Sequence, residues 1–298
     1  MANSMQRSGT NRQWLENKAI MGVFALMKLL PYRSRNRLMG ASLRGFMGNI
    51  IGYRKRIMNN LNLIYPNMVQ ERKTEIADQV LDNAGRTFIE NVYPAAFLVN
   101  NLEVELWGEG LEEVLKAHAI RRPIMFYSGH FGNHEAFRAA LFQRGIKVGG
   151  MVRRMANPYF DINYKNMLDI DGRSGPVFEA HPKGTLGFFK ALKTGSALVL
   201  LIDLAVSNGK FINFMGKPAC TSLTAANFAL KSNALFLPYF SMRNPDSESF
   251  RVEIGVPIDH SDPLTMTQEA TKSLEDRITK DPGNWFWIHR RWKHSPQF

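Results

Sequence analysis

The 298-residue chain contains one cysteine, Cys220, and this scarcity excludes two kinds of site. A single thiol cannot form an intrachain disulfide, and it cannot supply the cysteine cluster of a structural zinc site. Long hydrophobic runs are scarce as well. The N-terminal apolar stretch is free of charged residues only from Ala19 to Met27, whereas a membrane-spanning helix needs about 20 such residues. No small-residue cleavage site follows Leu29-Leu-Pro-Tyr32, so this stretch lacks the pattern of a secretory signal peptide.

Acidic residues are almost absent from the first fifth of the chain. Residues 1–60 contain eleven Lys and Arg but one acid, Glu16, and therefore hold most of the net charge of +12. Such a segment is expected to meet an anionic surface, which is a membrane, a nucleic acid or an acidic protein. The chain contains no known nucleic-acid-binding motif, so nucleic acid is not expected as a partner.

The first apolar segment runs from Trp14 to Leu30 and carries few charges. We expect a helix that lies on a membrane surface with Trp14, Phe24 and Leu26 on its buried side. The alternative is an ordinary core helix. The neighbouring basic residues 33–37 favour the membrane interpretation.

The spacing of apolar residues divides the chain near residue 100. Two further helices are predicted at about 36–60 and 69–96, so residues 1–100 form a basic N-terminal helical segment that associates with a membrane. From residue 104 onward, strands alternate with helices. Strands are predicted at 104–107, 124–127, 147–152, 177, 197–202 and 234–242, with 250–254 as an antiparallel edge strand; helices are predicted at 110–119, 157–168, 185–193, 221–232 and 268–280. This alternation predicts an α/β fold with a mainly parallel central sheet over residues 101–298, continuous with an amphipathic helical layer.

Residues 123–135 carry the strongest functional signal. A short apolar strand ends before Gly129, and Gly129 and Gly132 allow a sharp turn or a close approach to a ligand. Asn133 is expected to be the N-cap of the following helix. His130 is thereby placed at the carboxyl end of a strand, where open α/β sheets bind their ligands.

A histidine backed by a carboxylate is a general base with an orienting partner, and we assign these roles to His130 and Glu135. The alternative is that His130 or His134 only caps the helix or fills a crevice. The strand–glycine–histidine context favours catalysis for His130 but not for His134. These two histidines have metal-ligand spacing, yet the turn at Gly132 breaks their common helical face, so no metal site is expected.

Two more polar residues end predicted strands and should lie at the same edge of the sheet. Arg153 is expected to bind a phosphate or stabilise a developing oxyanion. Asp203 is expected to orient Arg153 or to bind polar groups of an acceptor. The alternatives are a surface arginine and a helix-capping aspartate.

The C-terminal stretch of residues 285–293 is rich in aromatic and basic side chains. Alternation by two would place Trp285, Trp287 and His289 on one face of a strand. The segment would pack on the sheet and offer Arg290 and Arg291 to lipid phosphates.

These motifs resemble a known family. The segment from His130 to Glu135 fits the H-x4-D/E pattern of membrane glycerolipid acyltransferases. Further segments, in the same order, are similar to those of the lipid A late acyltransferases, the lauroyl and myristoyl transferases of lipopolysaccharide biosynthesis. They are Asn62-Leu-Ile-Tyr-Pro66, Arg153 with Asn157-Pro158, Phe211-Ile-Asn-Phe-Met-Gly-Lys-Pro-Ala219 and Pro282-Gly-Asn-Trp-Phe-Trp-Ile-His-Arg-Arg-Trp-Lys293.

The resemblance implies a glycerolipid acyltransferase-like fold and an O-acyltransferase. The fatty acyl group would pass from an acyl carrier protein thioester, or from acyl-CoA, to a hydroxyl of a lipid A-type glycolipid, without a cofactor. The catalytic residues would be His130 and Glu135. The substrate-binding residues would be Asn133, Arg153, Asp203, Arg290 and Arg291. The enzyme would lie at the cytoplasmic face of the bacterial inner membrane, either peripherally or through an N-terminal anchor.

One departure leaves the acceptor open. The family often has Asp-Gln or Asp-His-Asp where this chain has Asp203-Leu-Ala. A lysophospholipid or another membrane lipid is therefore the alternative acceptor, and a thioester hydrolase or a non-catalytic membrane binder is the alternative function. A thioester is already activated, so neither Cys220 nor Ser128 is needed as a nucleophile.

Overall fold

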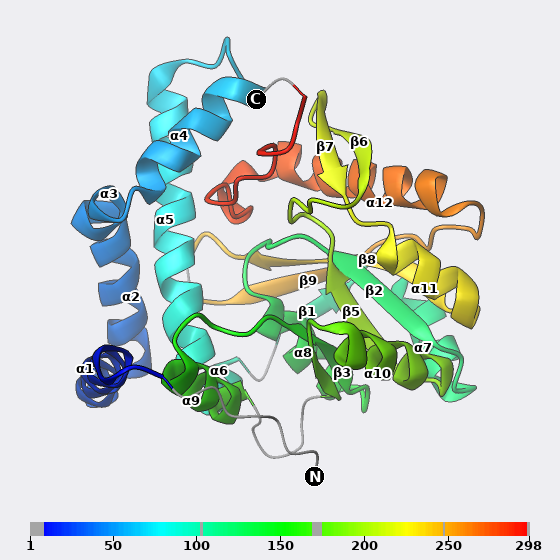
Figure 1. Ribbon diagram of the computed structural model, residues 1–298, viewed down its shortest axis with the longest axis horizontal. Coiled ribbons are helices and arrows are strands. Elements are labelled where there is room, and N and C mark those ends of the chain that lie inside the picture. Colours follow the sequence, from blue (N-terminus) through cyan, green and yellow to red (C-terminus); the bar gives the residue numbers. More distant parts are fainter. Residues whose placement is uncertain (1–8, 102–103, 169–174, 247, 297–298) are drawn as a thin grey trace.

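The computed structural model describes residues 9–101, 104–168, 175–246 and 248–296 and is built around a seven-stranded sheet (Figure 1). Its strand order is β1-β9-β8-β2-β5-β3-β4. All neighbouring strands run parallel except β8 and β9. The predicted α/β fold with a mainly parallel sheet is therefore confirmed. The strands are β1 Glu105–Trp107, β2 Ile124–Ser128, β3 Val148–Val152, β4 Val177–Glu179, β5 Ala197–Leu201, β8 Leu235–Arg243 and β9 Phe250–Ile254.

One strand prediction needs correction, and one pair of strands is additional to those predicted. Strand β9 is antiparallel to β8 as predicted, but it is not an edge strand, because β1 pairs with its other side. The hairpin of β6 (Lys210–Phe214) and β7 (Lys217–Thr221) is not predicted by the apolar pattern. It turns at Met215 and Gly216, whose φ angles of 55° and 74° suit a tight hairpin turn.

Helices cover the sheet and extend away from it. They are α1 Asn11–Met27, α2 Tyr32–Ser42, α3 Gly48–Ile50, α4 Tyr53–Ile64, α5 Gln70–Val92, α6 Pro94–Asn100, α7 Leu111–Ala119, α8 His134–Phe142, α9 Pro158–Leu168, α10 Pro182–Lys193, α11 Thr224–Ser232 and α12 Pro263–Lys280. The single helix predicted over 36–60 is wrong. A π-helical turn (Leu43–Met47) and Gly52, with φ of 74°, divide it into α2, α3 and α4.

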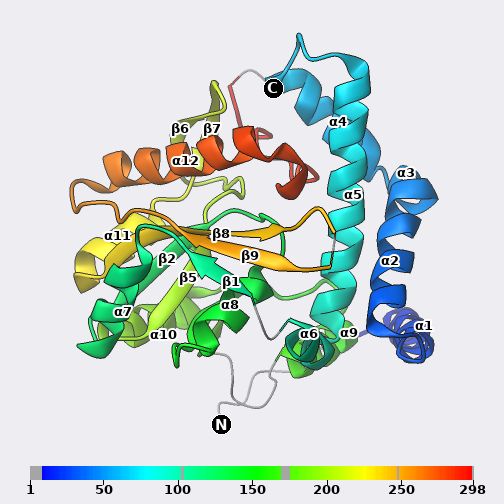
Figure 2. The ribbon, with the colours of Figure 1, turned by 180° about the vertical axis from the view of Figure 1, so that it is seen from behind.

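The two faces of the sheet bury different hydrophobic cores, because side chains alternate along each strand. In β2, Met125 and Tyr127 belong to the core that α5, α11 and α12 cover, whereas Ile124 and Phe126 belong to the core that α7 and α8 cover. Figure 2 shows α12 and α8 on opposite sides of the strands.

The N-terminal helices lie beside the sheet along α5 (Figure 1). Helix α1 packs through Phe24 and Met27 on the end of α5. Of the three residues predicted to face a membrane, Phe24 is instead buried inside the protein, whereas Trp14 and Leu26 are 45% and 69% exposed. Within the part of the chain that the structure describes, no helix combines the length and apolarity needed to cross a bilayer.

The core does not stop at residue 100. Ile76 and Val80 of α5 pack in the same cluster as Met125 and Tyr127 of β2. A buried ion pair adds a second connection, since Arg243 of β8 donates to both carboxylate oxygens of Glu90 in α5 at 2.8 and 2.7 Å. The helical layer and the sheet are therefore packed together rather than joined by a linker.

Candidate active site

The loop after β2 requires glycine at one position. Gly132 has a φ of 55°, and a Cβ atom there would lie 1.8 Å from the carbonyl oxygen of Ser241. Its amide donates to the carbonyl of Asn284 at 2.8 Å, so the loop is held from the C-terminal side. Asn133 then caps α8 by accepting from the amide of Glu135 at 2.9 Å, as predicted.

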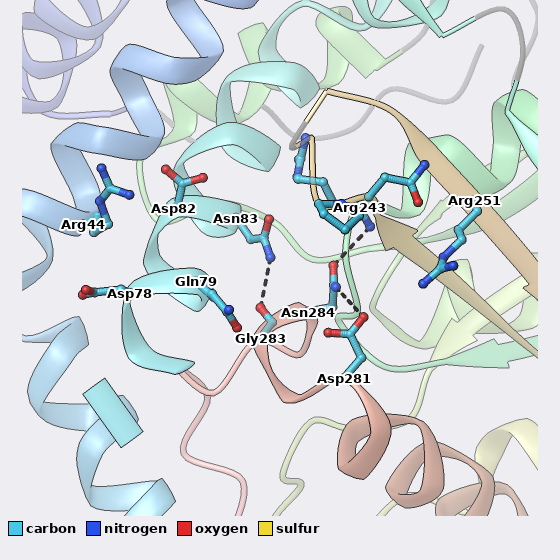
Figure 3. A pocket seen from close by; sticks show the side chains of 12 residues that line it. Arg44, Asp78, Gln79, Asp82, Asn83, Arg243, Arg251, Asp281, Gly283 and Asn284 are labelled. Carbon is cyan, nitrogen blue, oxygen red and sulfur yellow. Dashed lines mark hydrogen bonds between the residues drawn. The ribbon is translucent and has the colours of Figure 1, made fainter. Parts of the chain in front are cut away.

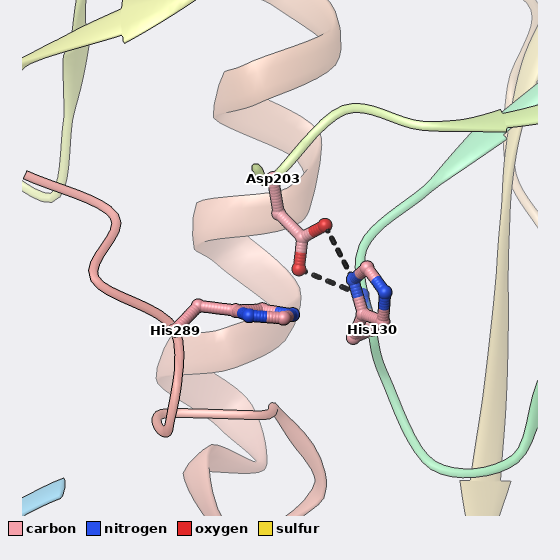
Figure 4. A group of neighbouring side chains, drawn as sticks. All are labelled: His130, Asp203 and His289. Carbon is pink, nitrogen blue, oxygen red and sulfur yellow. Dashed lines mark hydrogen bonds and ion pairs between the residues drawn. The ribbon is translucent and has the colours of Figure 1, made fainter. Parts of the chain in front are cut away.

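His130 lies in this loop and contacts Asp203, which follows strand β5 (Figure 4). Strands β2 and β5 are parallel neighbours, so the residues that follow them emerge at the same edge of the sheet. The Nδ1 atom of His130 lies 2.8 Å from Oδ1 of Asp203, and the His130 amide donates to Oδ2 at 2.7 Å. The indole N–H of Trp285 donates to the same Oδ2 at 3.0 Å. Asp203 therefore fixes both the backbone and the ring of His130.

The charge of Asp203 sets the tautomer of His130. Burial opposes ionisation of this carboxyl, but the charge and hydrogen bonds of His130, with a further contribution from His289, lower its pKa. An ionised Asp203 accepts hydrogen bonds, so Nδ1 of His130 carries the proton and donates it. The lone pair of Nε2 is then free to face a substrate, and the His130 side chain is 31% exposed.

The carboxylate that contacts His130 is Asp203 and not, as predicted, Glu135. Helix α8 begins at His134, which directs Glu135 toward its own helix. Its carboxylate lies 3.2 Å from Nη1 of Arg138, one turn further on, and 3.4 Å from Nε2 of His134. The proximity of Glu135 in sequence is thus outweighed by the helical geometry that starts between the two residues.

His289 is a member of the site that the sequence did not single out. Its ring meets the His130 ring edge to face, with 4.4 Å between the centroids (Figure 4). Burial lowers the pKa of His289 to about 4, helped by the charge that His130 gains on protonation and by Arg56 and Arg153, against the opposing effect of Asp203. His289 is therefore neutral near pH 7, and its Nε2 atom is buried without a hydrogen-bond partner.

The three side chains His130, Asp203 and His289 offer ligand atoms within 4.8 Å of one another. Such a trio can ligate a divalent metal in principle. Here both oxygens of Asp203 already accept hydrogen bonds, from His130 and Trp285. A metal would have to displace these bonds, so the arrangement suits acid–base chemistry better than metal binding.

Asn133 is fully buried and has structural partners. Its amide group donates to Oε2 of Glu90 at 2.7 Å while its oxygen caps α8. The predicted substrate contact of Asn133 is therefore corrected: both ends of the side chain are already bonded within the fold.

The three arginines predicted to bind substrate differ in position. Arg153 follows β3 at the same sheet edge as His130, and it is exposed. Arg290 is exposed as well. Arg291 is 1% exposed and donates to the carbonyl of Cys220 at 3.0 Å and to Oγ1 of Thr221 at 2.5 Å. The prediction that Arg291 binds lipid phosphates is therefore wrong.

Arg291 is buried because residues 285–293 do not form the predicted strand. They fold as successive turns, with one isolated bridge between Trp285 and Phe131. The indole rings of Trp285, Trp287 and Trp292 enter the core instead of sharing one face. The tryptophans of this segment thus anchor its turns to the hydrophobic core and do not mark a strand.

A polar pocket of about 410 Å³ lies between α5 and the C-terminal segment (Figure 3). Asn83 donates across it to the carbonyl of Gly283 at 3.0 Å, and the amide of Arg243 donates to Asn284 at 3.2 Å. These contacts hold the segment that supports the His130 loop. The pocket lining does not include His130; it consists of Arg44, Asp78, Gln79, Asp82, Asn83, Arg243, Asn244, Pro245, Arg251, Asp281, Gly283 and Asn284.

Comparisons with known proteins identify the family of this chain. Residues 4–294 match the family model described as bacterial lipid A biosynthesis acyltransferase. The chain is 26% identical over 306 residues to the lipid A biosynthesis lauroyltransferase of Escherichia coli K12, covering 96% of this chain and 94% of that protein. It is 28% identical over 249 residues to a lipid A biosynthesis acyltransferase of Haemophilus influenzae, covering 80% of this chain and 76% of the relative.

A histidine held by a buried carboxylate at the edge of an α/β sheet is an arrangement suited to group-transfer enzymes that activate a hydroxyl. Within that class, the chain belongs to the bacterial lipid A biosynthesis acyltransferase family. It is therefore an acyltransferase, and the family supports acyl transfer to lipid A.

Proposed function

We propose that this protein transfers a fatty acyl group from an acyl carrier protein thioester to a hydroxyl of a lipid A-type glycolipid precursor, with His130 as the general base. The observation that carries the proposal is the 2.8 Å contact between His130 and buried Asp203. This contact leaves Nε2 of His130 as a proton acceptor on the exposed side of the ring. Family membership supports the acceptor class.

The proposed chemistry needs no covalent enzyme intermediate. The acceptor hydroxyl attacks the thioester carbonyl carbon while His130 removes its proton, which forms a tetrahedral oxyanion. Collapse of this intermediate breaks the carbon–sulfur bond, and the thiolate takes the proton from His130. Asp203 stabilises the imidazolium between the two steps, and general-base catalysis of this kind contributes about 10²–10⁴-fold.

Arg153 is the proposed electrostatic partner of the oxyanion. It lies two strands from β2 at the same edge of the sheet, because β5 pairs with both β2 and β3. Its charge reaches the site, since it contributes to the lowered pKa of His289. Glu135 holds Arg138 and His134 on α8, and its proposed contribution is to keep that helix start in place.

We propose that the enzyme works on the cytoplasmic face of the bacterial inner membrane as a peripheral protein. The support is the basic first fifth of the chain together with apolar residues of α1 that do not pack in the protein. Among these, Leu15, Val23 and Leu26 are 61%, 52% and 69% exposed. The cations beside them favour an anionic lipid surface.

The test is an incubation of wild type and His130→Ala with a labelled acyl carrier protein thioester and a bacterial lipid extract, followed by separation of the lipid products by mass. We expect an acylated glycolipid with the wild type only. An acylated phospholipid instead would reject the lipid A acceptor, and free fatty acid formed without added lipid would indicate a hydrolase. Parallel reactions with acyl-CoA decide the donor. Equal product from His130→Ala would exclude this histidine as the base.

A further inference from the structure

A basic groove of about 480 Å³ opens between helix α4 and the C-terminal segment. Its lining contains four cations, Lys55 and Arg56 from α4 and Arg290 and Lys293 from the C-terminal segment, and it contains no acidic residue. The remaining lining residues are Gly52, Asn59, Asn60, Leu63 and Trp292. We call this feature the basic groove.

The two walls of the basic groove are held together by one side chain. The amide nitrogen of Asn60 donates to the backbone carbonyls of Trp287 at 2.7 Å and His289 at 2.9 Å. His289 in turn contacts the His130 ring. The groove therefore has a fixed position relative to the proposed base, and the charge of Arg56 is close enough to lower the pKa of His289.

The cations of the groove differ from their neighbours in lacking carboxylate partners. Arg54 of the same helix forms an ion pair with Asp78 at 2.6 Å, and Arg33 pairs with Glu248 at 3.0 Å. Within the described ranges, none of the four groove cations forms an ion pair with an acidic side chain. Four like charges gathered in one recess repel one another, and a bound anion would relieve that repulsion.

Exposed apolar side chains adjoin the basic groove on one side. Ile50 and Ile51 directly precede Gly52, which lines the groove, and they are 77% and 45% exposed. Phe46 of the preceding π-helical turn is 60% exposed. An anion-binding recess next to apolar residues matches the boundary between the headgroup and the chains of a lipid.

We propose that the basic groove binds a phosphate group in the headgroup of the acceptor lipid and thereby directs the acceptor hydroxyl toward His130. The inference rests on the proposed function and adds a phosphate subsite to it. Arginine and lysine both bind phosphate, and arginine does so with a planar pair of donors. A recess of this size accommodates a headgroup, whereas an acidic carrier protein would bury a broad surface of roughly 800 Å² on each partner.

The first experiment measures binding without any acyl donor. Wild type is compared with the double variant Lys55→Gln/Lys293→Gln, which removes one exposed cation from each wall, and with Lys147→Gln/Lys231→Gln as a control of equal charge. The probes are phosphatidylcholine vesicles with and without phosphatidic acid. We expect the groove variant to lose about tenfold or more in affinity for the phosphatidic acid vesicles, equivalent to at least about 1.4 kcal/mol. The control should retain its affinity, and equal losses in the two variants would overturn the proposal.

The second experiment measures KM for the acceptor lipid before and after phosphatase treatment. The groove variant should raise KM about tenfold for the untreated acceptor and have no further effect on the treated one. A higher KM for the acyl carrier protein thioester, with the acceptor KM unchanged, would assign the groove to the donor and overturn the proposal. If the vesicle result holds but lipid A-type acceptors are not acylated, the proposed function fails while the phosphate subsite stands.

Discussion

His130 and Asp203 are 73 positions apart in the chain, yet Nδ1 of His130 lies 2.8 Å from Oδ1 of Asp203. The contact follows from strand order, because β2 and β5 are parallel neighbours and each residue follows the end of its strand. The same carboxylate accepts from the Trp285 indole, so three distant segments meet at one side chain.

Asp203→Asn should reduce acyl transfer by roughly 10²–10⁴-fold, because the amide no longer stabilises the imidazolium and can select the wrong tautomer. Glu135→Gln leaves the contact between His130 and Asp203 in place and should therefore cost less activity. Initial rates with saturating donor and acceptor, on variants with unchanged circular dichroism, provide the measurement. A larger loss from Glu135→Gln would mean that a different carboxylate serves His130 during turnover.

Acid should destabilise the protein partly through His289. Its pKa is about 4 in the folded protein and 6.5 in the reference state, so the unfolded chain binds the proton more readily between these values. Stability is then lost as the pH falls from about 7 to about 5, by about 2 kcal/mol from this one residue. Urea unfolding of wild type and His289→Gln at both pH values isolates the effect, because other groups contribute equally to both proteins. If the free energy of unfolding fell equally in both proteins between these pH values, the lowered pKa of His289 would not be the cause.

The buried pair of Glu90 and Arg243 should be a strong stability determinant. The two side chains are 1% and 2% exposed, and they form two hydrogen bonds. Glu90→Gln removes the carboxylate that bonds both Nη atoms of Arg243, and breaking a buried pair in this way typically costs about 3–5 kcal/mol. Thermal or urea unfolding measures the loss. The exposed pair of Lys272 and Asp276 supplies the control, since Asp276→Asn should change stability by less than about 1 kcal/mol.

Arg290 and Arg291 are adjacent in sequence but should respond differently to substitution. Arg291→Gln removes donors from the Cys220 carbonyl and the Thr221 hydroxyl in a buried site, so a loss of roughly 2–4 kcal/mol is expected. Arg290→Gln affects an exposed side chain and should stay within about 0.5 kcal/mol of wild type. Unfolding free energies of the two variants decide the point; similar losses would show that Arg290 also has a structural role.

The sequence predicted the sheet well because its signals are local. Apolar runs such as Ile124–Ser128 mark buried strands, and the glycines around His130 mark the turn that follows. Asn133 was predictable as an N-cap for the same reason, since the cap depends on residues close by in the chain.

The partners within the site were not predictable in this way. Strand order decides which loop meets His130, and that order depends on long-range packing. The sequence alone therefore favours Glu135, five positions after His130, over the distant Asp203. The aromatic alternation from Trp285 suggested a strand, but the indoles are anchors of a turn segment that fill the core. His289 stands between tryptophans and arginines in the sequence, which marks the segment as unusual. That pattern does not indicate that its ring contacts His130.

The dependence of the His130 loop on residues 284–289 has a consequence for how the enzyme is made. Gly132 and His130 bond to the backbone of Asn284 and Phe286, and Asp203 needs the indole of Trp285. In a nascent chain, the seven strands of the sheet are complete before these residues are added, so the sheet alone cannot hold the His130 loop. A chain that stops before Asn284 lacks all three of these bonds, and the arrangement of His130 and Asp203 is therefore completed by the segment that is made last among its parts.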